Sequence, residues 1–279
     1  MSYRRRPKQE HPYSPIKRLR YLLSRAGGTR LQKSQNLRFV TFNGQRFKRL
    51  ILRDSFLAAE IERNLLRFGP SERIPPFVIR YEHEIWVEYI PGERLQQADD
   101  KAARDVAAFY ASVNARRARH LPLEETHFHG RLQLDLRFLN KVGMLDDAAL
   151  AELEEGAEAL KPADVWVGFD YTDPVLKNFV RRQDSGAVAA VDVESLEDDQ
   201  LIGTGAAKAC LRWMEPHRDA FLEAYAAGGE APDFRPYFGY VELCFLVAYK
   251  KLMFMERKWK HVDPGVFDRF RRLQNRAAQ

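Results

Sequence analysis

The order of hydrophobic and polar residues divides this chain into a strand-rich first part and a helix-rich second part. Two runs rich in β-forming residues, "NLRFVTF" and "QRFKRLIL", flank Asn43-Gly44, a dipeptide preferred at tight type I′ turns, so they predict a β-hairpin. The run "SFLAAEIERNLLRF" predicts a helix that ends at Gly69. The stretch "PFVIRYEHEIWVEYI" predicts two further strands around a polar turn, closed by Pro91-Gly92.

The character of the chain changes after Pro91. Four helices and one β-rich patch are expected there, the helices at 99–120, 145–161, 201–227 and 236–258 and the patch at 164–193. The last helix holds the most hydrophobic stretch of the chain, but Glu242, Lys250 and Lys251 interrupt it, which predicts a buried helix and not a membrane span. The pattern therefore predicts an α+β fold in which a small strand-rich lobe of about ninety residues precedes a larger helical lobe.

A basic segment lies before the first strand. Residues 1–14 are polar and predict a disordered arm, and "SPIKRLRYLLSR" predicts a short amphipathic helix capped by Ser14. Ile16, Leu19 and Leu23 share one face of that helix, and basic residues occupy most of the rest. Two interpretations stay open. Either the basic face binds a phosphate-rich surface such as anionic lipid or nucleic acid, or the apolar face packs on the first lobe and the basic residues face water.

Charge is distributed unevenly along the chain. The formal net charge of +6 is the sum of +13 over residues 1–50, −13 over 51–249 and +6 over 250–279. An acidic centre suits cation binding and repels a polyanion. The basic residues at the ends of the chain are not accompanied by a platform of interleaved aromatic residues, so no specific nucleic acid is expected as a partner. The two cysteines are far apart, and the stretch near Met1 contains no apolar h-region, so no signal peptide is expected. These features predict a cytoplasmic protein, with peripheral contact to the inner membrane as a hypothesis that rests on the basic segment.

Three polar residues in the second half have the spacing that phosphoryl transfer uses. Asp173 and Asn178 show the Asp-x4-Asn spacing of a kinase catalytic loop, and Asp192 ends the apolar run in "VAAVDVES". A carboxylate at position 173 orients an attacking hydroxyl and accepts its proton, while oxygens of Asn178 and Asp192 suit Mg²⁺. Between them "FVRRQDSGAVAAV" predicts a hairpin with a Ser185-Gly186 turn, which would bring the two metal ligands together. The alternative is that Asp173-Pro174 caps a turn and Asp192 merely ends a strand.

The first half offers counterparts that could bind ATP. Lys48 lies in the second strand of the predicted hairpin, where a lysine can reach the phosphates. The helix after it offers Glu60 or Glu62 as the acid that positions this lysine. Glu62 is preferred because Leu65 and Leu66 follow it by three and four residues and place it beside the core face. Gly27-Gly28, twenty residues before Lys48, could form a turn over the phosphates, although it is not a full GxGxxG.

Together with these residues, the stretch "IWVEYIPGERL" (85–95) resembles the aminoglycoside phosphotransferase and choline kinase-like family, a branch of the protein-kinase fold. The resemblance spans about residues 25–255. It implies a protein-kinase-like two-lobed fold, with a small antiparallel-sheet N-lobe and a larger, mainly helical C-lobe. The expected divisions are a basic arm over 1–24, a nucleotide-binding lobe with its hinge over 25–92, and a catalytic and substrate lobe over 93–279.

The resemblance also implies roles for particular residues. The hinge that binds adenine through backbone groups would be Glu88, Tyr89 and Ile90. The family's His-Gly-Asp-x4-Asn stretch falls on Tyr171-Thr172-Asp173 through Asn178, so the catalytic base would be Asp173 and the metal ligands Asn178 and Asp192. The implied cofactors are ATP and Mg²⁺. The implied acceptor is a hydroxyl of a small molecule or glycan, such as a sugar, an amino-alcohol or a lipid-linked envelope sugar.

Two positions depart from the family pattern. Tyr171 stands where the family has His, and "LIGTGAAKA" lacks the usual Asp, unless Asp198 or Asp199 substitutes for it. Because the three polar groups for metal and acceptor persist, the sequence favours an active kinase. The alternative is a pseudokinase or nucleotide-binding scaffold whose basic arm binds anionic lipid or RNA. The identity of the acceptor and the oligomeric state do not follow from the sequence.

Overall fold

The computed structural model describes residues 37–229 and 231–255, which fall into two compact units. Unit 1 contains residues 37–69 and 75–89 of the described chain, and unit 2 contains residues 70–74 and those from Ile90 onward. The predicted basic arm and the Gly27-Gly28 turn lie outside the described residues.

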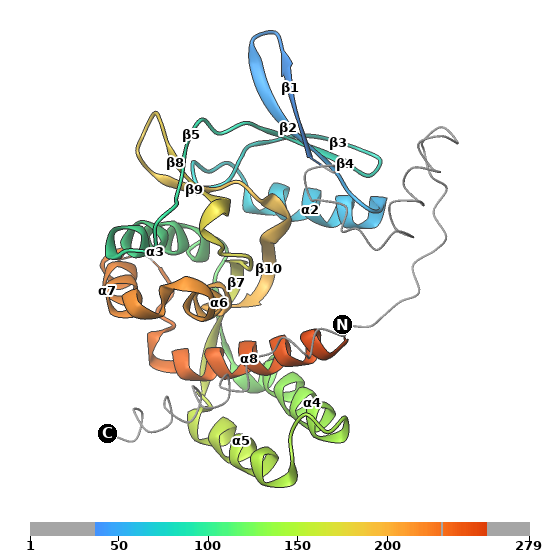
Figure 1. Cartoon of the computed structure of the whole chain (residues 1–279), viewed down its shortest axis with the longest axis vertical. Helices are drawn as coiled ribbons and strands as arrows, with labels where there is room; N and C mark the ends of the chain where they lie inside the picture. The colour runs from blue at the N-terminus through green and yellow to red at the C-terminus, as the bar shows by residue number, and fades with distance from the viewer. Residues whose placement is uncertain (1–36, 230, 256–279) are drawn as a thin grey trace. The chain divides into compact units, whose positions relative to one another are not determined.

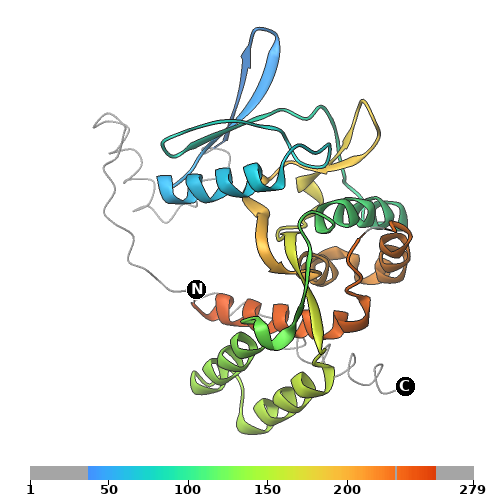
Figure 2. The same ribbon diagram turned by 180° about the vertical axis from the view of Figure 1, so that it is seen from behind.

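Unit 1 is a four-stranded antiparallel sheet with one helix packed on it (Figures 1 and 2). Its elements are β1 (Leu37–Phe42), β2 (Gln45–Ile51), α2 (Ser55–Phe68), β3 (Phe77–Tyr81) and β4 (Glu84–Glu88). The strand order is β1-β2-β4-β3. Asn43 and Gly44 have φ angles of +49° and +77°, as both central residues of a type I′ turn require. The predicted hairpin and the two later strands are confirmed.

Local sequence determines both ends of α2. The Asp54 carboxylate accepts the Leu57 N–H at 2.8 Å and so caps the first turn. Gly69 adopts a φ of +77° directly after the last helical residue, a conformation that glycine tolerates without steric cost. The buried positions of the helix share one face and are Ala58, Ile61, Leu65 and Phe68. The predicted helix with its glycine stop is therefore confirmed.

Unit 2 combines two small antiparallel sheets with most of the helices. The sheets have the strand orders β10-β7-β6 and β5-β8-β9. The strands are β5 (Gly92–Arg94), β6 (Arg119–Pro122), β7 (Asp164–Tyr171), β8 (Phe179–Arg182), β9 (Val188–Ala190) and β10 (Leu196–Leu201). The α-helices are α3 (Asp100–Asn114), α4 (Phe128–Lys141), α5 (Asp147–Leu160), α6 (Thr204–Ala209), α7 (Arg218–Ala227) and α8 (Phe238–Met255). In Figures 1 and 2, α3 lies beside α7, and α4, α5 and α8 gather at one end of the unit.

The sequence did not predict α4. Its stretch "RLQLDLRFL" alternates polar and apolar residues, a period typical of a strand. The buried positions are nevertheless Leu132, Asp135, Leu136 and Leu139, which follow helical spacing. Leu134 points outward and is 66% exposed. The sequence of this stretch is thus compatible with both the two-residue repeat of a strand and the 3.6-residue repeat of a helix, and tertiary packing favours the helix.

The helix expected at 201–227 is wrong as a single element. It consists of α6, a π-helical turn over Cys210–Met214, a short 3-10 turn over Glu215–His217, and α7. Pro216 lies in the 3-10 turn, where its missing N–H and its ring interrupt a regular helix. Helix α8 is the buried helix expected at 236–258, as far as the described residues extend, and its Glu242 pairs with Arg218 at 2.9 Å. In the described part of the chain no helix is both long and apolar enough to cross a membrane.

Candidate active site

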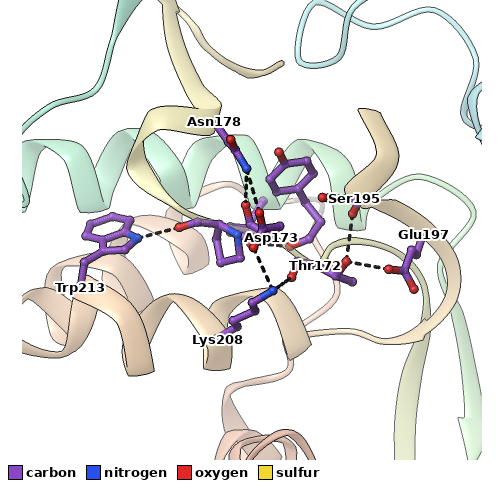
Figure 3. A network of polar contacts seen from close by, with 10 residues as sticks. Thr172, Asp173, Asn178, Ser195, Glu197, Lys208 and Trp213 are labelled. Carbon is purple, nitrogen blue, oxygen red and sulfur yellow. Dashed lines mark hydrogen bonds and ion pairs between the residues drawn. The ribbon is translucent and has the colours of Figure 1, made fainter. Parts of the chain in front are cut away.

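The loop between β7 and β8 brings Asp173 and Asn178 together. Backbone bonds from Val175 N–H to the Asp173 carbonyl (2.9 Å) and from Asn178 N–H to the Val175 carbonyl (2.8 Å) fold the loop into two tight turns. Asn178 Nδ2 then donates to Asp173 Oδ2 at 3.1 Å and to the Asp173 carbonyl at 3.0 Å (Figure 3). The residues predicted as base and metal ligand are therefore in direct contact.

The hairpin formed by β8 and β9 carries Asp192 back to this loop. Its pairing register includes Phe179 opposite Ala190, and Gly186 at its turn has a φ of +71°. Val191 N–H donates to the Asn178 carbonyl at 2.8 Å. The predicted hairpin is confirmed, and it places Asp192 directly after the residue that pairs with Asn178.

A second backbone bond joins the same two segments at their other ends. Thr172 N–H donates to the Ser195 carbonyl at 2.8 Å. The Thr172 hydroxyl also donates to Glu197 at 2.7 Å (Figure 3). Segments 172–178 and 191–195 thus lie side by side, with Asp192 on the second of them at 9% exposure.

The donor set of this pair fits a hard divalent cation. The Asn178 amide directs its NH₂ group toward Asp173, so its carbonyl oxygen points elsewhere. Asp192 adds a carboxylate from the neighbouring segment. Two oxygen ligands of this kind, completed by waters and substrate phosphates, are the usual protein contribution to a Mg²⁺ site.

Lys208 and Trp213 complete the surroundings of the loop, and the sequence analysis missed both. Lys208 Nζ lies 2.9 Å from Asp173 Oδ1 and 2.7 Å from the Thr172 carbonyl (Figure 3). Trp213 Nε1 donates to the Pro174 carbonyl at 2.7 Å. In sequence, a single lysine in "GAAKA" looks like any lysine on a helix surface, so only the three-dimensional contact reveals it.

Tyr171, the first departure from the family pattern, belongs to the core. Its side chain is fully buried, and its ring packs edge to face on Phe109 with centroids 5.4 Å apart. Burial raises the pKa of Tyr171, and the carboxylates of Asp192 and Asp173 raise it further. The hydroxyl lies near the Asn178 side chain and the Asp192 backbone, which lower the pKa, yet it completes no hydrogen bond of ordinary geometry. The substitution therefore fills the space behind the loop with an aromatic side chain and leaves Asp173 in contact with Asn178.

Asp170 binds the segment in which the second departure lies. Its buried carboxylate accepts Tyr171 N–H at 2.7 Å, Gly203 N–H at 3.1 Å and Gly205 N–H at 3.0 Å. The two glycines belong to "LIGTGAAKA", the segment that lacks the expected acid. The acid thus stands on β7 and two of its backbone donors stand at the start of α6, so Asp170 tethers the start of α6 to β7.

Asp198 and Asp199, the two candidates to replace the missing acid of "LIGTGAAKA", lie on β10. Asp199 forms an ion pair with Arg119 and donates its N–H to Asp198 Oδ1 at 2.8 Å.

Gly205 makes the close approach of α6 to β7 possible. A Cβ atom at this position would lie 2.2 Å from the Tyr171 carbonyl oxygen and 2.4 Å from the Tyr110 hydroxyl. That hydroxyl itself donates to the Tyr171 carbonyl at 2.7 Å. Only glycine therefore lets the helix start rest against the strand that leads into the loop.

Solved structures with the same architecture are enzymes that phosphorylate small molecules. Macrolide 2′-phosphotransferase MphH of Brachybacterium faecium aligns with a TM-score of 0.58 and 15% identity over 88% of this chain and 96% of that one. Choline kinase LicA of Streptococcus pneumoniae aligns with a TM-score of 0.57 and 10% identity over 92% of this chain and 96% of that one. An ethanolamine kinase of Plasmodium vivax follows with a TM-score of 0.52 and 11% identity over 88% and 84%.

The chain has the fold of these phosphotransferases. The predicted fold class and the resemblance drawn from the sequence are confirmed at the level of the fold. No protein-family model matches the sequence, and no curated protein sequence is similar to it.

Within this phosphotransferase fold, unit 1 carries Lys48, Glu62, Glu88 and Tyr89, and Ile90 belongs to unit 2. Lys48 is 7% exposed on β2 and shares a sheet face with the buried Leu50 and Val87. Glu62 on α2 forms an ion pair with Arg80 of β3. The predicted Lys48–Glu62 pair stays a prediction.

The predicted hinge starts at the end of β4. Glu88 N–H donates to the Pro76 carbonyl at 2.9 Å and Tyr89 N–H to the Arg46 carbonyl at 3.0 Å. Ile90 is 5% exposed. Adenine binding by this segment would therefore use backbone carbonyls or the backbone of Ile90.

A second group of ligand-type side chains lies where α6 gives way to the turns that follow it. Ligand atoms of Cys210, Glu215 and Glu242 are within 4.8 Å of one another. Glu242 forms an ion pair with Arg218 at 2.9 Å, which offsets the cost of burying its carboxylate in the core.

The contact of Asp170 with the start of α6 leads to a stability prediction with a defined pH dependence. Burial raises the pKa of Asp170 from its ordinary 3.8 to about 7, the three N–H groups oppose the shift, and Glu197 adds to it. Between these two pH values the folded protein keeps a proton that the unfolded chain has lost. The stability from this proton is present below about pH 4 and is lost as the pH rises to about 7.

Asp170→Asn is expected to lower the thermal midpoint by several degrees at about pH 5. An amide nitrogen accepts no hydrogen bond, so at least one buried N–H loses its partner at a cost of about 1–3 kcal/mol. Because Asn does not titrate, the difference in unfolding free energy from wild type should shrink between about pH 5 and pH 8. Urea unfolding at both pH values measures this difference. Asp199→Asn, which removes an exposed pair with Arg119, is the control, and a difference independent of pH would contradict the assignment.

Proposed function

We propose that the protein is an enzyme that transfers the γ-phosphoryl group of ATP to a hydroxyl of a small molecule or glycan. The observation that carries this proposal is the contact of Asp173 with both Asn178 and Lys208, in a loop hydrogen-bonded to the Asp192 segment. A carboxylate beside a metal-ligand pair is the arrangement that phosphoryl transfer to an alcohol requires.

Each residue of unit 2 has a role in this proposal. Asp173 orients the acceptor hydroxyl and accepts its proton. Asn178 and Asp192 hold Mg²⁺ through their oxygens. When bound, Mg²⁺ neutralises charge on the phosphates and holds them in place. The fixed geometry of segments 172–178 and 191–195 keeps base and metal ligands in register before substrates arrive.

The predicted nucleotide contacts are also part of the proposal. Lys48 lies on β2 at 7% exposure, and a lysine on a strand of this lobe can bind the phosphates of ATP. Glu62 on α2 would position this lysine. Glu88, Tyr89 and Ile90 would bind adenine, and Gly27 and Gly28 would cover the phosphates.

The acceptor is proposed only as a class. The similar structures act on macrolides, choline and ethanolamine according to their names. For this protein we propose a soluble or lipid-linked sugar or an amino-alcohol, phosphorylated in the cytoplasm. A pool of polar metabolites incubated with the enzyme, Mg²⁺ and ATP, and analysed for newly phosphorylated products, would identify it.

Turnover tests the proposal against the non-catalytic alternative. ADP release from ATP should require Mg²⁺ and should depend on Asp173 and Asp192. Nucleotide binding without any turnover, with either water or the metabolite pool as acceptor, would favour a pseudokinase and overturn the proposed activity.

We further propose that the basic arm brings the enzyme to an anionic membrane surface. Residues 1–25 hold eight Lys or Arg against one acid, Glu10, and each basic residue near such a surface contributes about 1 kcal/mol. Deletion of residues 1–25 should abolish sedimentation with phosphatidylserine vesicles at low salt and leave turnover of ATP in solution intact. Neutral phosphatidylcholine vesicles are the control. If the full-length protein ignores anionic vesicles, or if the deletion unfolds it, the arm packs on the protein and the membrane hypothesis is wrong.

A further inference from the structure

Lys208 is held against the catalytic loop by the way α6 starts. Gly203 and Gly205 at its first turn are bound by Asp170, and Gly205 rests on the end of β7. Lys208 follows Gly205 by three residues and therefore lies on the same face of the helix. The tether that fixes the helix start thus also aims Lys208 at the loop.

The π-helical turn over Cys210–Met214 extends the same face. Trp213 follows Lys208 by five residues, a spacing that an α-helix would place on another side but that a π-helical turn brings closer into line. Its indole N–H reaches the Pro174 carbonyl at 2.7 Å. Figure 3 shows both side chains directed at the loop from the helical segment. Two consecutive loop residues, Asp173 and Pro174, are therefore held from one side.

The contacts of Lys208 leave part of its donor capacity for a substrate. An ammonium group has three N–H donors. One is used by the Thr172 carbonyl at 2.7 Å and one by Asp173 Oδ1 at 2.9 Å. The side chain keeps 20% exposure. The remaining donor is available to a group that approaches Asp173.

The group that approaches Asp173 in the proposed reaction is the acceptor hydroxyl, whose oxygen becomes bonded to phosphorus. Since Asn178 occupies Asp173 Oδ2 and Lys208 occupies Oδ1, a hydroxyl bound to this carboxylate lies beside the ammonium group. When the phosphoryl group is transferred to that hydroxyl, its negatively charged oxygens therefore also lie beside the Lys208 ammonium group.

We propose that Lys208 is a catalytic residue that binds the phosphoryl group during its transfer. This inference rests on the proposed function. In the step, the bond from the acceptor oxygen to the γ-phosphorus forms, the bond from that phosphorus to the β–γ bridging oxygen breaks, and ADP leaves. The acceptor proton passes to Asp173. Lys208 stays protonated and donates a hydrogen bond to a non-bridging phosphoryl oxygen, where developing charge makes the bond strongest.

Binding of a transition-state mimic tests this role without knowledge of the acceptor. Mg·ADP alone and Mg·ADP with aluminium fluoride, a mimic of the phosphoryl group in flight, are titrated into wild type, Lys208→Met and Lys208→Gln. Wild type should bind the fluoride complex more tightly than Mg·ADP. Both variants should bind Mg·ADP within about twofold of wild type and lose about ten- to a hundredfold of the gain from aluminium fluoride, as expected for one charge-assisted hydrogen bond.

Controls separate this role from a structural one. Lys161→Met removes an exposed lysine at the end of α5, paired only loosely with Glu158 at 3.5 Å, and should keep the full gain. Lys208→Gln retains a donor for the Thr172 carbonyl, so it remains informative if the Met variant fails to fold. A Lys208 variant that keeps both its Mg·ADP affinity and the full gain overturns the inference while the proposed function stands. Wild-type protein that binds no Mg·ADP overturns the proposed function and the inference with it.

Discussion

Asp192→Ala is expected to abolish Mg²⁺-dependent binding and turnover of ATP. The site offers two hard ligands on adjacent segments, Asn178 and Asp192, and only the second carries a charge. A neutral amide oxygen with waters does not hold Mg²⁺ against the solvent, because the ion sheds its hydration shell reluctantly. Removal of the carboxylate should therefore remove metal and nucleotide together. Titration of ATP with and without Mg²⁺ measures the binding directly, independently of turnover.

The hairpin itself supplies the control for this experiment. Asp184→Ala changes an exposed aspartate near the turn of the same hairpin, where it pairs with Arg182. This variant should bind Mg·ATP like wild type, and both variants should retain the thermal midpoint within a few degrees. If Asp192→Ala binds Mg·ATP with wild-type affinity, the metal ligands have been assigned wrongly.

Asp173→Asn is expected to lower kcat by roughly 10²–10⁴-fold with little change in the affinity for ATP, the typical contribution of a general base. The amide has nearly the same shape and can still accept one hydrogen bond from Asn178 or Lys208, so the loop should keep its fold. It cannot take a proton from the acceptor hydroxyl. ADP release with the metabolite pool as acceptor, together with titration of Mg·ATP, separates the loss of chemistry from a loss of binding.

Asp164→Asn is the matched control for this substitution, since Asp164 is exposed at the far end of the same strand, β7. Its turnover should equal that of wild type. Asp170 cannot replace Asp173 as base, because it is fully buried and its oxygens already accept three backbone N–H groups. Turnover that survives in Asp173→Asn would therefore mean that the Asp-x4-Asn spacing serves structure alone.

The sequence by itself determined the features that depend on neighbouring residues. The Asn43-Gly44 turn, the ends of α2 at Asp54 and Gly69, and the hairpin between Asn178 and Asp192 all follow from turn and capping chemistry. These signals are local, because a φ angle or a cap is satisfied within a few residues. The contact of Asp173 with Asn178 belongs to this class, since one short loop contains both.

Only the tertiary structure decided the parts that come from distant positions. Asp170 meets Gly205 across 35 residues, and Lys208 meets Thr172 across 36. The sequence pattern within one element does not predict such a contact. Its energy comes from the packing of α6 on β7, and neither sequence specifies which element the other will pack against. The same holds for α4, whose alternating residues suit a strand until Asp135 and its neighbours are buried against α8. For this reason the departures at Tyr171 and in "LIGTGAAKA" looked like losses in the sequence. In the structure Tyr171 packs in an aromatic core, and Asp170 on β7 accepts hydrogen bonds from the two glycines of "LIGTGAAKA".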